Sequence, residues 1–566
     1  MAASCPEPQY IDHPEESRPR QTDPISDDTQ LTSDENVFVT KELDESYGDN
    51  HPLLENLENQ QRQQIRMKWV SKLAPTCRDF ISTLRTWVES ITPQTIKETT
   101  YSAITTALWD LIPSFLQASK PKSTKRHPTE WLDGCRGWAA LAVVFVHTYS
   151  VFLHDRGIQT LDWFITLPWI YLLLNGHASV AIFFVVSGFS LSYKPVKLTR
   201  AGDFAGLAKS MTSSVFRRWP RLYLPIAIIT FPEMFLVYYG YFPDRPQNAF
   251  QATPHAWTAA RPQPTLWMQF EDWRLNIQDR SDPLRLLNLA RLFEEGFPYD
   301  GNLWTIPIEF RGSMWVFLTV ISLASFRTKY RIMLVSVFAM HCLVWVHWDV
   351  FLFLCGFLLA ELHFVVRERD DPNQESTWKS HIPREVFAAM NYGFATFILS
   401  MPVWDPGSEG EFPFETIWWF TPNKYRGSPH HYRFWPAIGA VWYIIAIDNG
   451  KCLQKLYTNP LSQYLGRISY CLYLVHGSIL KTFGWSLADR MVNMLGFSIG
   501  MPIAIVVYSL VVLWFADFTT RVVDEKSVRF GRWVFDKMCR KSSVESGNER
   551  ATISELSGSR RINQEA

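Results

Sequence analysis

The chain has 566 residues, and its 55 basic and 55 acidic side chains give a formal net charge of zero. Because proteins that hold nucleic acid usually carry a basic excess, we do not expect a nucleic acid partner. Hydrophobic residues make up 47% of the chain, yet the mean hydropathy is close to zero, so a polar region must offset long apolar segments.

The two ends of the chain differ from its middle. Residues 1–60 are rich in Asp, Glu, Pro, Ser and Gln and have few large apolar side chains, which predicts a disordered cytosolic tail. Apolar residues recur at helical spacing over residues 61–116. The region 61–127 is therefore interpreted either as amphipathic helices on the membrane surface or as a soluble helical pair packed on the main domain. Residues 524–566 are interpreted as a cytosolic C-terminal tail.

Long apolar segments lie between residues 128 and 523. Their lengths predict an all-α fold, a polytopic membrane helix bundle of about ten transmembrane helices. The expected spans are residues 132–153, 176–193, 222–241, 303–325, 332–348, 350–366, 386–403, 434–447, 464–483 and 501–522.

Basic residues gather in every second loop between these spans. The loops are 194–218, 327–331, 367–384, 451–455 and 521–532, whereas the intervening loops are poor in basic residues, acidic or mixed. Since cytosolic loops carry the excess of Lys and Arg, both termini are expected in the cytosol. The N-terminus has no basic patch followed by an apolar core, so no cleaved signal peptide is expected and membrane insertion would rely on the internal helices. The endoplasmic reticulum or another endomembrane is the expected location, although the sequence leaves the choice of membrane open.

The first expected span carries two ionisable side chains, Arg136 and His147. Eleven residues are almost a whole number of helical turns, so both side chains lie on one face of the helix, roughly 16 Å apart. Ionisable groups inside a bilayer are costly and usually face a cavity or a partner, which favours a functional role. The alternative is a histidine that hydrogen-bonds to a neighbouring helix.

Two further polar clusters lie where apolar spans begin. Arg218 and Arg221 share a helical face if the helix continues through Pro220, and two guanidinium groups suit phosphate oxygens, although they could equally be topogenic charges. Glu309 enters the fourth span and is followed by Arg311. Its carboxylate could polarise an imidazole or simply pair with that arginine.

The ninth span contains Ser469, Tyr470, Tyr473 and His476. The tyrosines are more readily explained by helix packing than by catalysis. The eight cysteines are scattered without zinc-ligand spacing, so neither a metal site nor a disulfide framework is expected.

Taken together, these motifs resemble the acyltransferase-3 family of multi-pass membrane acyltransferases, fungal members in particular. WLDGCRGWAALAVVFVH at 131–147 matches the family's arginine and histidine signature, and Arg218 with Arg221 matches its paired arginines. LWTIPIEF at 303–310 is similar to another family element, with Thr305 where serine is commoner and Pro307 interrupting the start of the helix. FFVVSGFSLSY at 183–193 and LGRISYCLYLVH at 465–476 resemble two more, and the resemblance extends over about 128–517.

The resemblance implies an acyltransferase that moves an acyl group, acetyl in the simplest case, from acyl-CoA to a hydroxyl. His147 would be the base, Arg136 would guide the donor, and Arg218 and Arg221 would bind the phosphates of coenzyme A. Glu309 would orient His147 or the acceptor. Acyl-CoA would be a co-substrate, with no permanently bound cofactor and no metal.

The acceptor is expected to be a small molecule, such as a secondary metabolite or a carbohydrate, or a glycan. The aromatic residues Trp257, Trp267 and Trp273 of the long loop after the third span could stack on it.

Three other classes of protein share some of these features. A transporter or lipid flippase would also contain buried charges, but the sequence has no repeat between two halves. The membrane-bound O-acyltransferase fold would place its essential histidine late in the chain, where His476 is the candidate. A receptor or scaffold would leave the polar clusters unexplained.

Overall fold

The computed structural model describes residues 113–114, 127–153, 167, 169–242, 260–283, 297–369, 378–402 and 414–539. The chain divides into two compact units, residues 1–103 and 104–566, and every described residue belongs to the second. The predicted disordered tail, residues 1–60, and nearly all of the region 61–127 therefore lie outside the described residues.

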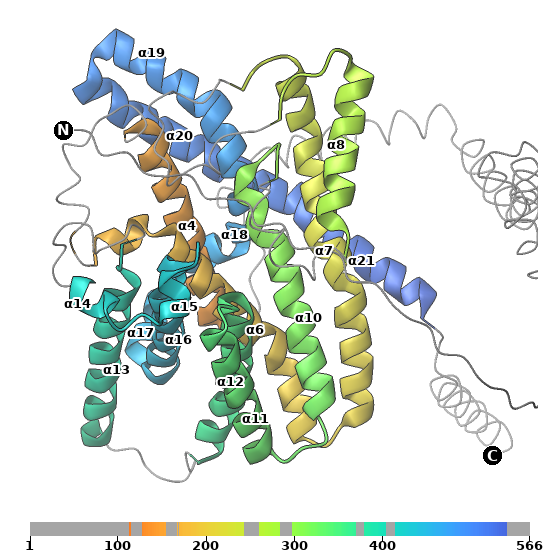
Figure 1. The fold of residues 1–566 in the computed structure, drawn as a ribbon, viewed down its shortest axis with the longest axis vertical. Coiled ribbons are helices and arrows are strands. Elements are labelled where there is room, and N and C mark those ends of the chain that lie inside the picture. Colours follow the sequence, from red (N-terminus) through yellow and green to blue (C-terminus); the bar gives the residue numbers. More distant parts are fainter. Residues whose placement is uncertain are drawn as a thin grey trace, which may run out of the picture. The chain divides into compact units, whose positions relative to one another are not determined.

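Every element in the described part of the chain is helical, which confirms the all-α prediction. Figure 1 shows the helices coloured along the sequence. They are α4 (Glu130–Phe152), η2 (Tyr171–Leu174), α6 (Gly176–Arg200), α7 (Phe204–Tyr238), α8 (Leu266–Ser281), η5 (Gly301–Trp304), α10 (Thr305–Leu323), α11 (Thr328–Val344), α12 (Trp348–Arg369), α13 (Trp378–Leu399), α14 (Phe414–Trp418), α15 (Asn423–Arg426), η6 (His431–Arg433), α16 (Phe434–Asn449), α17 (Lys451–Thr458), α18 (Pro460–Ile479), η7 (Leu480–Gly484), α19 (Trp485–Leu495), α20 (Phe497–Thr519), η8 (Thr520–Asp524) and α21 (Glu525–Met538).

Six helices in the described ranges are long and apolar enough to cross a membrane. They are α4, α6, α7, α10 with its preceding turn η5, α12, and the continuous helix from Phe497 to Met538. The other four expected positions are also helical, in α11, α13, α16 and α18, but these helices do not combine the required length and hydropathy. The structure therefore supports a membrane protein with six candidate spans, and the count of ten stays a prediction.

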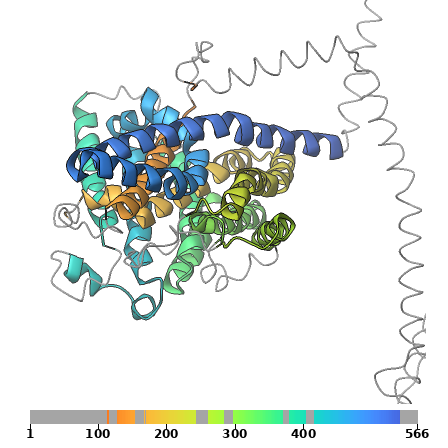
Figure 2. The same cartoon turned by 90° about the horizontal axis from the view of Figure 1, so that it is seen from above.

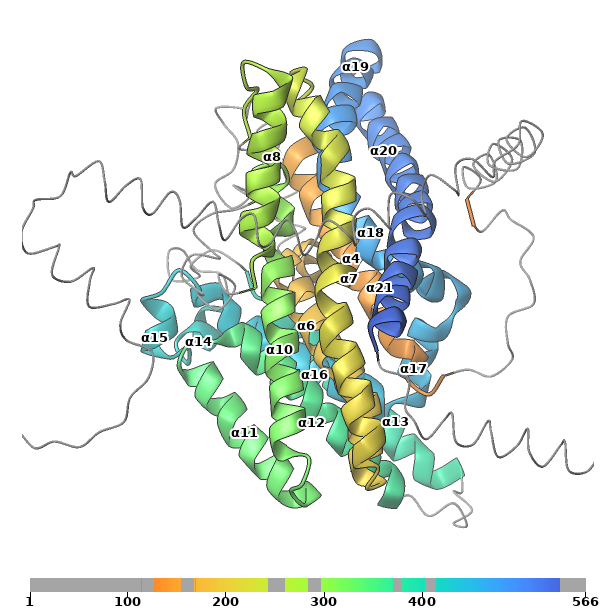
Figure 3. The same cartoon turned by 90° about the vertical axis from the view of Figure 1, so that its right-hand side faces the viewer.

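The helices pack as a bundle in which neighbours in space are often distant in sequence. Helix α4 packs against α18, and α6 packs against α12. Figures 1 and 3 both show α7 and α10 running side by side, with α8 packed against α7. In Figure 2, α20 and α21 form one long rod along the bundle, with α19 beside α20.

Two helices differ from their expected boundaries. Helix α7 begins at Phe204, well before the expected residue 222, and continues through Pro220, so Arg218 and Arg221 lie on one unbroken helix. Helix α10 begins at Thr305 and holds Pro307 in its first turn. Proline is tolerated there because the first backbone N–H groups of a helix have no intrahelical acceptor. The helix start near Glu309 is thus regular despite the proline.

Helices α4 and α18 touch through two glycines. A Cβ atom on Gly137 would lie 2.4 Å from the backbone nitrogen of Gly466, and one on Gly466 would lie 2.4 Å from the carbonyl oxygen of Asp133. Small residues at such positions let helix backbones approach closely, as is typical of membrane helices.

The same two helices run parallel and in register. His147 follows Gly137 by ten residues, and His476 follows Gly466 by ten residues. Ten residues advance each helix by about 15 Å. The two histidines therefore lie level with each other, as the two glycines do, one such distance further along the helices. The imidazoles of His147 and His476 indeed meet.

We expect Gly466→Ala to destabilise the protein by about 1–3 kcal/mol, because the added methyl group forces α18 away from α4. The measurement is the thermal unfolding midpoint of the purified protein in detergent. Gly393→Ala is the matched control, since a Cβ atom at this position of α13 has nothing within 4 Å, and alanine raises helix propensity. Equal midpoints for the two variants would contradict the close contact.

Candidate functional site

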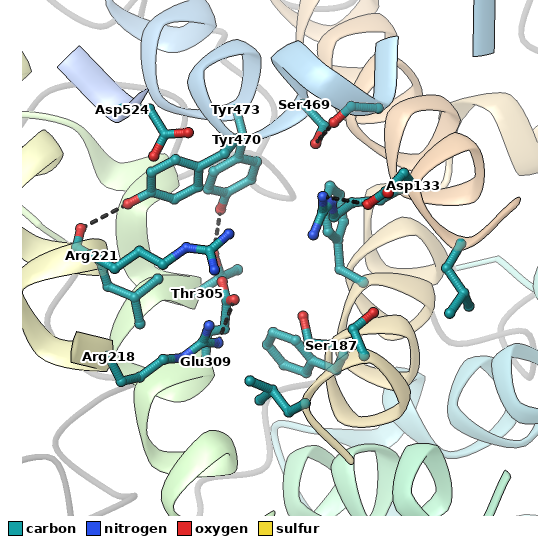
Figure 4. Close-up of a pocket in the computed structure, with 18 of the residues that line it drawn as sticks. Asp133, Ser187, Arg218, Arg221, Thr305, Glu309, Ser469, Tyr470, Tyr473 and Asp524 are labelled. Carbon is teal, nitrogen blue, oxygen red and sulfur yellow. Dashed lines mark hydrogen bonds and ion pairs between the residues drawn. The ribbon is translucent and has the colours of Figure 1, made fainter. Parts of the chain in front are cut away.

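A cavity of about 490 Å³ opens between helices α4, α6, α7, α10 and α18, a size within the usual range of ligand pockets. Figure 4 shows Arg218, Arg221 and Glu309 on one side of it and Asp133 and Ser187 on the other. Its lining residues are His127, Thr129, Leu132, Asp133, Arg136, Val180, Phe183, Phe184, Ser187, Ser190, Leu191, Tyr193, Lys194, Arg218, Arg221, Leu222, Thr305, Ile306, Glu309, Gly466, Arg467, Ser469, Tyr470, Tyr473 and Asp524.

The charged side chains of the cavity have a cationic excess. Four arginines and a lysine outnumber three carboxylates. The basic residues are Arg136, Lys194, Arg218, Arg221 and Arg467, and the acidic ones are Asp133, Glu309 and Asp524. A cleft lined by an excess of one charge attracts ligands of the opposite charge, so the cavity suits an anionic ligand.

Arg218 is fixed by two partners in the wall of the cavity. Its Nη2 lies 2.8 Å from Oε1 of Glu309, and its Nε donates a hydrogen bond of 2.8 Å to Oγ of Ser313. The arginine is only 7% exposed, so its charge is largely removed from solvent and needs the carboxylate to stabilise it. Glu309 therefore pairs with Arg218, whereas Arg311 pairs with Asp349 at 2.8 Å elsewhere in the bundle.

The other two predicted arginines also reach the cavity. Arg221 is exposed there, one helical turn after Arg218. Arg136 lies across the cavity on α4, where Asp133 holds it at 2.8 Å. The structure thus brings together four of the five residues singled out from the sequence, namely Arg136, Arg218, Arg221 and Glu309.

The fifth residue, His147, is not among the lining residues of the cavity. Its Nδ1 lies 2.8 Å from Nε2 of His476, which is completely buried, while His147 itself is half-buried. The two rings are almost parallel, with an angle of 6° between their planes. The histidine of the first span and that of the ninth span therefore form one pair.

Tyr473 lies next to both the cavity and this histidine pair. It lines the cavity, and its ring centroid is 5.8 Å from that of His476. Its hydroxyl donates a hydrogen bond to the carbonyl oxygen of Asn302 and accepts one of 2.7 Å from Oγ1 of Thr305. Tyr473 therefore contacts both the cavity and the region of the histidine pair, and its hydroxyl is held by two hydrogen bonds.

A cluster of buried charges that the sequence analysis did not single out lies near His476. Nζ of Lys481 is 3.2 Å from Oδ1 of Asp300, and Oγ of Ser478 donates a hydrogen bond of 2.5 Å to Glu233. The three charged residues are at most 4% exposed. Lys481 falls inside the expected ninth span, and an ionisable residue in an apolar span is the signal that could have found the cluster.

The long loop after the third span contains α8, which packs on α7. Trp273 donates a hydrogen bond of 3.0 Å to Oγ1 of Thr230, and Trp267 is 67% exposed. Neither tryptophan lines the cavity, and Trp257 lies outside the described residues. A role of these tryptophans in acceptor binding stays a prediction.

Within the described ranges, no group of three or more His, Cys, Asp or Glu side chains is arranged to hold a metal ion. The cysteines described there are free thiols, four of them buried.

Comparison with known proteins places the chain in a family. The model of an acyltransferase domain family matches residues 129–521, which includes all five predicted site residues. The chain belongs to the acyltransferase-3 family. The resemblance to this family that the sequence motifs indicated is thereby confirmed.

Curated members of this acyltransferase family align over most of the chain. The O-acetyltransferase PaAT-1 of Phomopsis amygdali is 30% identical over 76% of this chain and 89% of its own length. The acyltransferase clz18 of Cochliobolus lunatus is 22% identical over 64% and 85%, and the acyltransferase R4 of a Phoma species is 23% identical over 75% and 99%. No solved structure matches the chain.

We expect Glu309→Ala to lower the stability of this acyltransferase by about 3–5 kcal/mol, because it leaves the buried Arg218 guanidinium without its charged partner. Glu309→Gln should cost less, since the amide oxygen can still accept the hydrogen bond. Thermal unfolding in detergent measures both effects. Glu525→Ala is the control, because its ion pair with Arg467 is exposed and contributes little. A midpoint shift for Glu309→Ala no larger than that of the control would refute this interpretation.

Proposed function

We propose that the protein is a membrane-embedded O-acyltransferase that moves an acyl group, acetyl in the simplest case, from acyl-CoA to a hydroxyl of a small molecule. A secondary metabolite or a carbohydrate is the proposed acceptor class. The observation that carries the proposal is the cationic cavity, one of whose lining residues, Tyr473, lies beside a pair of histidines. The printed names of the relatives, an O-acetyltransferase and two acyltransferases, agree with it.

In this proposal the cavity binds the donor. Arg218 and Arg221 bind phosphate groups of coenzyme A, since guanidinium groups form paired hydrogen bonds to phosphate oxygens. Glu309 keeps the Arg218 guanidinium in place. The pantetheine arm runs along Arg136 and past Tyr473, so that the thioester reaches His147. A long, thin donor fits this arrangement because its phosphates and its acyl carbon are far apart.

The histidine then acts as a general base. His147 takes the proton of the acceptor hydroxyl while the hydroxyl oxygen attacks the thioester carbonyl carbon. The resulting oxyanion re-forms the carbonyl and expels the thiolate of coenzyme A, which takes the proton from His147. The products are one ester and one free thiol. Holding both substrates in the right orientation can lower the barrier by up to about 7–11 kcal/mol.

For Glu309 the sequence left two roles open, to orient His147 or to orient the acceptor. The carboxylate faces the cavity and pairs with Arg218, while Nδ1 of His147 faces His476. We therefore assign Glu309 to the cavity, where it positions Arg218 and the substrates.

The proposed membrane arrangement has ten spans, with both termini in the cytosol and the protein in the endoplasmic reticulum or another endomembrane. Helices α11, α13, α16 and α18 supply the four spans beyond the six candidates. The alternation of basic loops supports this topology. It lets coenzyme A enter the cavity from the cytosol.

A transporter or flippase of a lipid or small metabolite is the second candidate. It is favoured by the buried charges of Glu233, Asp300 and Lys481, because such groups often line transport pathways inside membranes. The two functions differ in a measurable way, since a transporter moves its substrate across vesicle membranes without changing its mass.

We expect His147→Ala to reduce acyl transfer by about a hundredfold to ten-thousandfold while donor binding is retained, because the base is lost and the cavity is not. The measurement is mass spectrometry of metabolites from cells that express either protein, looking for a product that is heavier by one acyl unit. His341→Ala, which removes an exposed imidazole of α11, is the control. Unchanged product in the His147 variant would overturn the proposal.

We expect Arg221→Ala to raise the Michaelis constant for acyl-CoA by about tenfold to a hundredfold, since a charged hydrogen bond contributes about 1.5–3 kcal/mol, while kcat changes less. Initial rates over a range of acetyl-CoA concentrations measure both constants. Arg490→Ala is the control, because Arg490 is exposed on α19 and does not line the cavity. An equal rise in the two variants would show that Arg221 does not bind the donor.

A further inference from the structure

The two imidazoles of the histidine pair meet edge to edge. Nδ1 of His147 and Nε2 of His476 are 2.8 Å apart, while the ring centroids are 5.1 Å apart and the rings are almost parallel. Because the centroids are much farther apart than the two nitrogens, these nitrogens lie between the two rings and point toward each other. The two rings therefore lie in nearly one plane. This is the geometry of a hydrogen bond between ring nitrogens, in which one nitrogen carries the hydrogen and the other accepts it.

The backbone decides which nitrogen carries the hydrogen. Nδ1 of His476 lies 2.8 Å from the carbonyl oxygen of Tyr473 and 3.2 Å from that of Leu472. Carbonyl oxygens only accept hydrogen bonds, so Nδ1 of His476 carries a hydrogen. A second hydrogen on Nε2 would make a fully buried imidazolium, which is costly. Nε2 of His476 is therefore the acceptor, and Nδ1 of His147 is the donor.

We propose that His476 is a positioning residue that holds His147 as the tautomer with hydrogen on Nδ1, so that the lone pair for catalysis is on Nε2. The inference rests on the proposed function of His147 as the base. His476 does not itself act as the base, because it is fully buried and both of its ring nitrogens face hydrogen-bond partners.

This positioning matters during the reaction as well as before it. When Nε2 of His147 takes the proton of the acceptor hydroxyl, the ring becomes an imidazolium. Its hydrogen bond from Nδ1 to His476 then becomes charge-assisted and stronger. Before the reaction, His476 thus favours the tautomer of His147 that can act as a base. As the transition state forms, it stabilises the positive charge that develops on the His147 ring.

Two amide variants of His476 separate this role from a structural one. Glutamine places an amide oxygen near the position of Nε2 and can still accept from His147, whereas asparagine places its amide near Nδ1 and can only keep the bond to the backbone carbonyl. We expect His476→Gln to retain most of kcat. His476→Asn should lose about a hundredfold to ten-thousandfold in kcat, as expected for a base in the wrong tautomer, with the Michaelis constant for the donor unchanged.

The kinetic assay uses the full chain in lipid nanodiscs, radiolabelled acetyl-CoA and a metabolite extract of host cells as the source of acceptors. Thermal unfolding of each variant reports on folding. The opposite order, with asparagine active and glutamine inactive, or equal kcat values for both variants and the parent protein, would overturn the positioning role.

A second measurement does not depend on activity. Nitrogen NMR of the full chain with 15N-labelled histidine, assigned by comparison with the His147→Ala and His476→Gln variants, shows which ring nitrogens carry hydrogen. We expect hydrogen on Nδ1 of His147, none on Nε2 of His476, and a coupling across the hydrogen bond between them. Hydrogen on Nε2 of His476 would overturn the assignment. If the expected tautomer is present but no acyl transfer occurs, the proposed function fails and the assignment stands.

Discussion

The contact between α4 and α18 is the constraint on which the site depends. Gly137 and Gly466 allow the two backbones to touch, and any larger side chain at either position would meet backbone atoms of the other helix. Because the helices are parallel and the histidines follow their glycines at equal spacing, this one contact also sets the distance between His147 and His476. The packing of the two helices therefore also fixes the geometry of the two imidazoles.

The charges of the cavity follow a second constraint, the cost of placing ions in a bundle of apolar helices. Arg218 forms an ion pair with Glu309, and Arg136 forms one with Asp133. Neither guanidinium charge is therefore stabilised by solvent alone. Arg221 is exposed and supplies positive charge at the cavity surface. This division suits a site for an anion, since the paired arginines are fixed in place and an exposed arginine can neutralise the ligand.

Tyr473 links these two regions. It lines the cavity on one side and approaches His476 on the other, and Thr305 and Asn302 fix its hydroxyl. The sequence analysis had explained this tyrosine by packing. Its placement shows that a packing residue inside a helix bundle can also line a cavity and contact a buried histidine.

The sequence by itself determined the all-α class of fold, the approximate locations of the apolar helices and the family, because helix periodicity, span length and short motifs are local properties. It singled out Arg136, His147, Arg218, Arg221 and Glu309 as candidates for the same reason. It did not place the start of α7, which lies at Phe204. Only the tertiary structure decided the partners of these residues. Glu309 pairs with Arg218 and not with Arg311, and His147 meets His476, a residue from the other end of the domain. Such pairings depend on which helices pack together and in what register, and no local pattern encodes that.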